Sequence, residues 1–124
     1  MAKIRDHREL VVWQKAMDAA MQVFEVTRAF PLEERYSLTD QMRRASRSVA
    51  AQIAEGWRGR RYRAAFINKL SEAEGEAAEM QTHIEIARRC GYLSDPVAAE
   101  LDTVYNEILS MLVSMSKHIE KWTP

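Results

Sequence analysis

The sequence contains one cysteine, Cys90, among its 124 residues. A lone cysteine excludes an internal disulfide and a cysteine-rich metal site, and it fits a reducing compartment. The chain also has no run near the ~20 consecutive apolar residues that a membrane-spanning helix needs. Residues 1–8 are mostly polar or charged, which is not the pattern of a secretory leader. We therefore expect a cytoplasmic protein with no membrane segment.

Glycine and proline are also scarce, at 4 and 3 residues. Few helix-breaking residues and no long β-branched runs favour helix along the whole chain. Apolar residues make up 47% of the chain and charged residues 29%, so a packed core is feasible and disorder is not expected. At this length we expect one domain over residues 1–124.

The spacing of apolar residues divides the chain into four segments. Repeats of three and four positions predict helices over about residues 9–29, 39–60, 64–90 and 96–121. Phe30-Pro31 ends the first segment and Gly91 ends the third. Residues 1–8 are expected to form a frayed tail. The pattern predicts an all-α fold, specifically an antiparallel up-and-down four-helix bundle.

The same periodicity predicts the residues that form the core. In segment 9–29 these are Leu10, Trp13, Met17, Ala20, Phe24 and Thr27. In segment 39–60 they are Met42, Ala45, Val49, Ile53 and Gly56. In segment 64–90 they are Phe66, Leu70, Ala73, Ala77, Met80, Ile84 and Ala87. A separate stripe of small residues is a candidate oligomer seam or a tight contact inside the bundle: Ser71, Gly75, Ala78 and Thr82.

Net charge is zero, yet basic and acidic residues are segregated along the chain. Residues 40–70 hold eight Lys or Arg and two acidic residues, whereas residues 71–107 hold two Arg and nine acidic residues. A neutral total argues against a general nucleic-acid coat, which needs a strongly basic domain. Two interpretations remain open: a local patch that binds phosphate, or a basic face that meets an acidic one.

Seven arginines are the candidate nucleic-acid contacts: Arg43, Arg44, Arg47, Arg58, Arg60, Arg61 and Arg63. Guanidinium groups bind phosphate in a bidentate geometry, and Trp57 and Tyr62 are candidates for stacking on exposed bases. The alternative is that the arginines pair with the acidic helices or meet solvent.

Polar side chains form two further clusters. The first is a strip that forms either a buried hydrogen-bonded network or an ordinary exposed face: Gln41, Arg44, Ser48, Gln52, Glu55 and Glu79. The second is the set Glu72, Glu76, Glu79 and His83. A di-iron site needs Glu-x-x-His on two helices and glutamates on two others, so this set has too few ligands. The sequence also shows no nucleophile beside a base. For these two reasons we expect no metal, no cofactor and no enzyme activity.

One motif resembles a known family. Gln41-Met42-Arg43-Arg44-Ala45 and the following Ser48 to Gly56 resemble the hallmark of small bacterial proteins encoded in intervening sequences of large-subunit ribosomal RNA genes. Leu10 to Ala16, Phe30-Pro31, and Ala73 with Gly75 and Glu79 also match, so the resemblance covers about the whole chain. Ala50 and Gln52 stand where the family has Pro and Asn. Without Pro at position 50, we expect a locally straight helix.

The resemblance implies a four-helix bundle that assembles into a homopentamer with no established enzymatic activity. In shape the family is distantly similar to the accessory variability determinant of diversity-generating retroelements, a basic pentamer that binds nucleic acid and a reverse transcriptase. We therefore predict a non-enzymatic oligomeric protein that binds RNA or a nucleic-acid-processing protein through its arginines. The alternative is a purely protein-binding scaffold whose arginines are used between subunits. No small-molecule substrate is expected.

Overall fold

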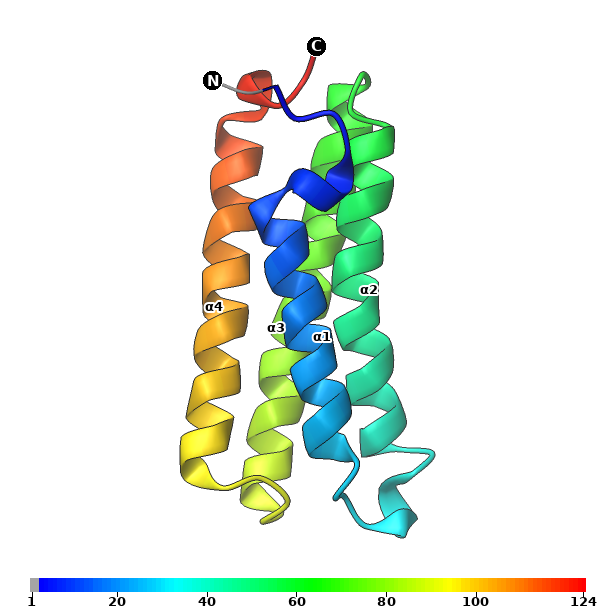
Figure 1. Ribbon diagram of the computed structural model, residues 1–124, viewed down its shortest axis with the longest axis vertical. Coiled ribbons are helices and arrows are strands. Elements are labelled where there is room, and N and C mark those ends of the chain that lie inside the picture. Colours follow the sequence, from blue (N-terminus) through cyan, green and yellow to red (C-terminus); the bar gives the residue numbers. More distant parts are fainter. Residues whose placement is uncertain (1–2) are drawn as a thin grey trace.

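The computed structural model describes residues 3–124, and this part of the chain forms four long helices (Figure 1). They are α1 (Val11–Thr27), α2 (Leu38–Arg58), α3 (Arg63–Arg89) and α4 (Asp95–Lys117). Short 3₁₀ turns flank them at His7–Glu9, Leu32–Glu34 and Ile119–Lys121. Residues 3–124 contain no strand, so the all-α prediction is confirmed.

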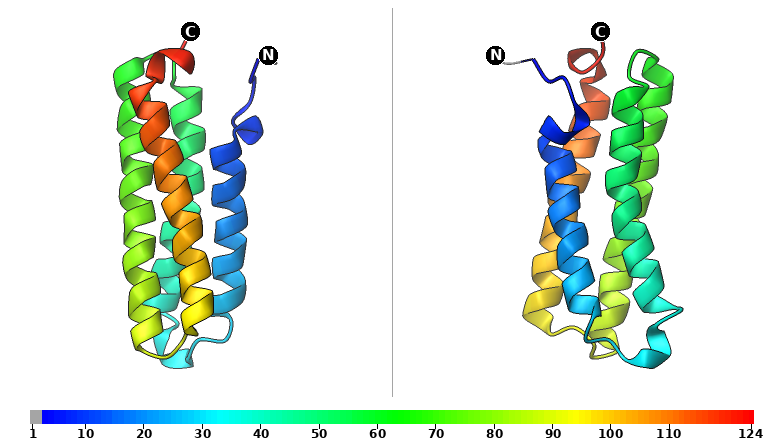
Figure 2. Two further views of the ribbon diagram at one scale, coloured as in Figure 1. Left: turned by 90° about the vertical axis from the view of Figure 1, so that its left-hand side faces the viewer. Right: turned by 45° about the vertical axis from the view of Figure 1, so that its right-hand side comes forward.

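The helices run up and down in chain order. Each helix packs against the next one in sequence, and α4 packs against α1 to close the bundle (Figure 2). The α2–α3 connection lies at the same end of the bundle as both termini (Figure 1). The other two connections lie at the opposite end. The antiparallel four-helix bundle predicted from the sequence is therefore present.

The helix ends differ from the predicted ones by one to four residues, for local reasons. The chain from Asp6 is ordered rather than frayed, because Asp6 and Glu9 form a reciprocal capping box around the first turn. That turn ends at Leu10, so α1 begins at Val11 instead of Glu9. At the other end of the chain, α4 stops at Lys117, and the remaining helical turn is a separate 3₁₀ turn.

Gly91 ends α3 as predicted, and Ser94 caps the start of α4. Gly91 has a φ of 78°, a left-handed conformation that glycine adopts without strain. Its N–H donates to Arg88, and the N–H of Tyr92 donates to Ala87, which is the Schellman pattern that closes α3. Ser94 then accepts a hydrogen bond from the Val97 N–H and caps α4.

The core of α2 and α3 is the predicted one. All five residues assigned to the core face of α2 and all seven assigned to that of α3 are buried. The assignment for α1 is only partly confirmed, because Leu10 and Thr27 are buried but the four residues predicted between them are not. Its buried residues are Val12, Ala16, Ala19, Val23 and Thr27, while Trp13, Ala20 and Phe24 are half-buried and Met17 is exposed. Because α1 is apolar on more than half of its circumference, periodicity alone could not select the inner face.

Helices α2 and α3 come close together at Gly56. A methyl group at this position would lie 3.0 Å from Cβ of Lys69 and 3.2 Å from Cδ1 of Phe66. Phe66 is completely buried and cannot move without disturbing the core. Gly56 therefore permits the short α2–α3 spacing, despite its low helix propensity.

We predict that Gly56→Ala destabilises the fold by about 1–3 kcal/mol, because the added methyl overpacks the α2–α3 contact. Gly75→Ala is the matched control, since no atom lies within 4 Å of the Cβ it would add. That change should raise the free energy of unfolding by up to about 1 kcal/mol through helix propensity. Denaturant unfolding of dilute protein measures both. An equal gain in stability for both variants would show that the contact at Gly56 is not tight.

A side-chain tie joins two connections at the end of the bundle away from the termini. The Tyr92 hydroxyl donates to Glu34 Oε2 at 2.8 Å, and the Ser37 hydroxyl donates to the other carboxylate oxygen. These donors lower the pKa of Glu34, the Ser37 bond contributing most. The same contact with Glu34 raises the pKa of Tyr92 to about 12. The tie holds the α1–α2 connection against the α3–α4 connection.

We predict that Tyr92→Phe lowers the melting temperature, and that the loss depends on pH. A carboxyl whose pKa is lowered by folding stabilises the fold above its ordinary pKa of 4.5, and this contribution disappears as pH falls through the lowered value. The difference from the wild type should therefore be largest near neutral pH and shrink as the solution becomes more acidic than about pH 4. Melting curves across this range test it. A difference that stays constant into the acidic range would contradict the linkage.

Candidate nucleic-acid interface and interhelical groove

The seven candidate arginines do not form one surface. Arg43 turns toward α1, where its Nε donates to the Thr27 hydroxyl at 3.0 Å. Its guanidinium carbon also lies 4.9 Å from the centroid of the Phe24 ring. Arg43 is half-buried by these contacts. It therefore acts as a brace between α1 and α2 and is a poor candidate for phosphate contact.

Arg44 turns the other way, toward α3. It forms ion pairs with Glu76, at 3.4 Å, and with Glu79. His83 Nε2 lies 3.2 Å from the same Glu79 carboxylate. Arg44 therefore fits the alternative interpretation, in which arginines pair with the acidic face of the neighbouring helix.

Arg60 lies against Trp57 at the end of α2. Its guanidinium carbon is 3.9 Å from the indole centroid, and its Nη1 donates to the Trp57 carbonyl oxygen at 2.9 Å. The Trp57 side chain packs edge-on against Phe66, and the residue is 4% exposed. The prediction that Trp57 stacks on bases is therefore wrong, because this side chain belongs to the core.

Three other arginines of the set lie at or beside the α2–α3 connection. Arg58, Arg61 and Arg63 are exposed, and none pairs with a carboxylate of residues 3–124. Between them Tyr62 is 63% exposed, with the Arg61 guanidinium carbon 5.2 Å from its ring centroid. We call this group, Arg58, Arg61, Tyr62 and Arg63, the arginine turn. Its three exposed cations and one exposed aromatic ring lie at or beside the α2–α3 connection, which Figure 1 shows at one end of the bundle.

The predicted polar strip divides into two separate ion-pair groups. Gln41 accepts a hydrogen bond from Arg44 at 3.3 Å, so it joins the Arg44–Glu79 group. Glu55 instead pairs with Lys69 at 3.0 Å. The pKa of Lys69 is raised because it donates to Glu55 and, secondarily, to Glu72. The remaining strip residues, Ser48 and Gln52, are half-buried.

The acidic set of α3 is also spread over different partners. Glu72 pairs with Lys69, whereas Glu76 and Glu79 pair with Arg44. Among residues 3–124, no group of three or more His, Cys, Asp or Glu side chains is arranged to hold a metal ion. The structure thus places Glu76 and Glu79 in ion pairs between α2 and α3, and Glu72 in a pair within α3.

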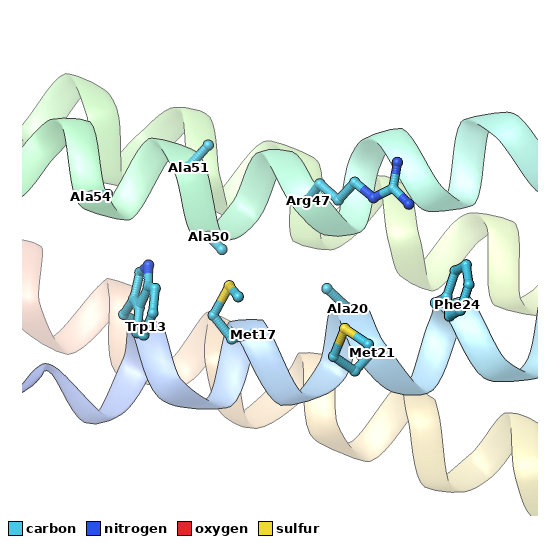
Figure 3. Close-up of a pocket in the computed structure, with 9 residues that line it drawn as sticks. All are labelled: Trp13, Met17, Ala20, Met21, Phe24, Arg47, Ala50, Ala51 and Ala54. Atoms are coloured by element: carbon cyan, nitrogen blue, oxygen red, sulfur yellow. The ribbon is translucent and has the colours of Figure 1, made fainter. Parts of the chain in front are cut away.

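A groove between α1 and α2 is the main feature that the sequence did not predict. It has a volume of about 470 Å³, within the range of ligand-binding clefts. Figure 3 shows the large side chains of α1 in a row facing the alanines of α2. The lining residues are Trp13, Met17, Ala20, Met21, Phe24, Arg47, Ala50, Ala51 and Ala54. Four of the six residues predicted as the core face of α1 therefore line this groove.

Arg47 is the one charged side chain in the lining of this groove. It is exposed and pairs with no carboxylate of residues 3–124. The two methionines of the groove are also accessible, since Met17 is 38% exposed and Met21 is 56% exposed. The groove thus combines unfilled apolar surface with one unpaired cation.

The small-residue stripe of α3 faces away from the bundle. Ser71, Gly75, Ala78 and Thr82 are all exposed, and space around Gly75 is open. The stripe is therefore not a tight contact inside one chain. Its interpretation as an oligomer seam remains a prediction.

In the described part of the chain, every helix is too short or too polar to cross a membrane. Comparison with proteins of curated function found no match. A solved crystal structure is similar: a protein with unknown function from the S23 ribosomal protein family of Bacteroides thetaiotaomicron VPI-5482. The identity is 28%, the TM-score is 0.78, and the match covers 86% of this chain and 99% of that one.

A family profile settles the resemblance seen in the central motif. The profile is that of the 23S rRNA-intervening sequence proteins, and it matches residues 8–114. This range includes all of α1, α2 and α3 and most of α4. The chain therefore belongs to the family of 23S rRNA-intervening sequence proteins.

Proposed function

We propose that this protein is a self-associating, non-enzymatic RNA-binding protein whose RNA contact is the arginine turn. The observation that carries the proposal is the set of three exposed arginines, Arg58, Arg61 and Arg63, without carboxylate partners in residues 3–124. Unpaired guanidinium groups are free to form bidentate contacts with phosphate. Arg43, Arg44 and Arg60 are left out of the proposed interface, because their guanidinium groups already contact Thr27, Glu79 and the Trp57 ring.

Tyr62 supports single-stranded RNA as the ligand. One face of the ring lies beside Arg61, and most of the side chain is exposed. An unpaired base can stack on such a ring while neighbouring arginines contact the backbone. In a duplex the bases are stacked on each other and are not available for this contact.

A protein-binding scaffold is the second candidate function, and the α1/α2 groove favours it. Exposed apolar surface of this kind marks a contact with another protein. Arg47 lies in this groove, away from the arginine turn. The two candidates therefore use different parts of the molecule and can be tested separately.

We predict that an unstructured oligo(U) RNA binds with an affinity that falls steeply between about 50 and 200 mM salt. The triple variant Arg58→Ala, Arg61→Ala and Arg63→Ala should bind more weakly. Its plot of log K against log salt should be shallower, with a slope smaller in magnitude by about 2. Fluorescence anisotropy titrations measure both quantities. A matched pair of single variants tests the position of the contact. Arg61→Ala should weaken binding, whereas Arg28→Ala, which removes a charge at the opposite end of the bundle, should not. Oligo(U) binding that is absent at low salt would remove the RNA proposal.

We predict that Tyr62→Ala weakens binding of the same RNA by about 1–3 kcal/mol, the loss of one stacked base. Tyr62→Phe should retain most of the affinity, because the ring is kept. Tyr62 is exposed, so neither variant should change the thermal stability of the bundle. Equal affinity for oligo(U) and for an RNA duplex, with no effect of Tyr62→Ala, would show that stacking plays no part.

A further inference from the structure

The α1/α2 groove requires an occupant of particular chemistry. Its lining is apolar except for Arg47, and its floor contains the small side chains Ala50, Ala51 and Ala54. Small side chains let another helix backbone approach closely, and an unpaired cation favours an occupant with a carboxylate. The groove follows α1 from Trp13 to Phe24, which is about 16 Å at 1.5 Å per residue. A helical face of about three turns fits this length.

A second groove cannot be the occupant. If two copies packed groove to groove about a twofold axis, the same patch would meet itself. The contact would then contain Arg47 of each copy and no carboxylate from the groove lining, and charges without a partner in an apolar contact are costly. Two concave surfaces also leave their shared interior unfilled. The occupant should therefore be a different surface that carries an unpaired carboxylate.

The outer face of α3 has these properties. Its exposed stripe runs from Ser71 to Thr82, also about 16 Å long, with exposed Ile67 and Ile86 beyond its ends. Residues 70–87 contain five glutamates, and four of them pair with Lys69, Arg44, Arg88 or Arg89: Glu72, Glu76, Glu79 and Glu85. Glu74 flanks the stripe and, within residues 3–124, forms no ion pair. The one unpaired cation of the groove thus has a counterpart on the surface that fits it.

We propose that the α1/α2 groove of one copy receives the outer face of α3 from a second copy, with Arg47 facing Glu74 of that copy. This inference rests on the self-association in the proposed function and does not depend on RNA binding. The contact joins two different surfaces, so every copy keeps one free groove and one free α3 face. Repetition of the contact therefore builds a ring or a filament rather than a simple dimer.

Two blocking variants test which surfaces meet. Ala51→Arg fills the groove, and Gly75→Arg places a bulky cation on the α3 face; both positions are exposed, so the bundle should fold. In sedimentation, each variant alone should be a monomer where the wild type assembles. An equimolar mixture should form a one-to-one complex and stop there, because the intact α3 face of one variant fills the intact groove of the other.

Asn106→Arg is the matched control, since it adds the same charge to an exposed position of α4. It should assemble like the wild type, and circular dichroism should confirm that all three variants are helical. A wild type that stays monomeric at high concentration overturns this inference and the proposed self-association, but not RNA binding. A wild type that assembles while the mixture fails to pair overturns this inference alone.

A charge exchange tests the predicted ion pair without added bulk. Arg47→Glu and Glu74→Arg should each weaken assembly roughly tenfold, because each places like charges opposite one another. The double variant should recover most of the wild-type association, since the pair is restored with its sign reversed. Two single effects that simply add in the double variant would show that Arg47 and Glu74 do not meet.

Discussion

The close approach of α2 to α3 at Gly56 is the constraint on which the arrangement of the bundle depends. With its core face against the interior and α3, α2 turns Ala50, Ala51 and Ala54 toward α1. Across from them α1 places large side chains, including Trp13 and Phe24, while its small residues Ala16 and Ala19 face inward. Large groups opposite alanines do not fill the space between the two helices. Helix α2 therefore packs closely on its α3 side and leaves a groove on its α1 side.

The sequence predicted the parts of the fold where one face is clearly more apolar than the rest. The seam of α3 is bounded by glutamates, so its inner face was unambiguous from Phe66 to Ala87. In α1, by contrast, both Val12 and Trp13 belong to stripes with helical spacing, and only packing decides which stripe is covered. Trp57 was placed at the surface for a similar reason, because nothing in its arginine-rich surroundings signals that Phe66 packs against it.

The candidate site was predicted as a set of residue types but not as an arrangement. Sequence identified the arginines correctly as the dominant basic feature, yet whether each is free depends on neighbours that are distant in the chain. Arg44 finds Glu79 on the next helix and Arg43 finds Thr27 on the previous one, while Arg61 finds no carboxylate in residues 3–124. Tertiary packing therefore separates the arginines that brace the bundle from those available to a ligand.

The central claim is that the α1/α2 face is open in one chain and is covered in the assembly. Methionine oxidation by hydrogen peroxide tests it directly, because Met17 and Met21 lie in the groove whereas Met42 and Met80 are fully buried. Relative to the monomeric Gly75→Arg variant, whose groove is unchanged, the assembled wild type should oxidise more slowly at Met17 and Met21, with Met42 and Met80 slow in both. Equal oxidation rates at the two groove methionines in the assembled and monomeric proteins would contradict the account.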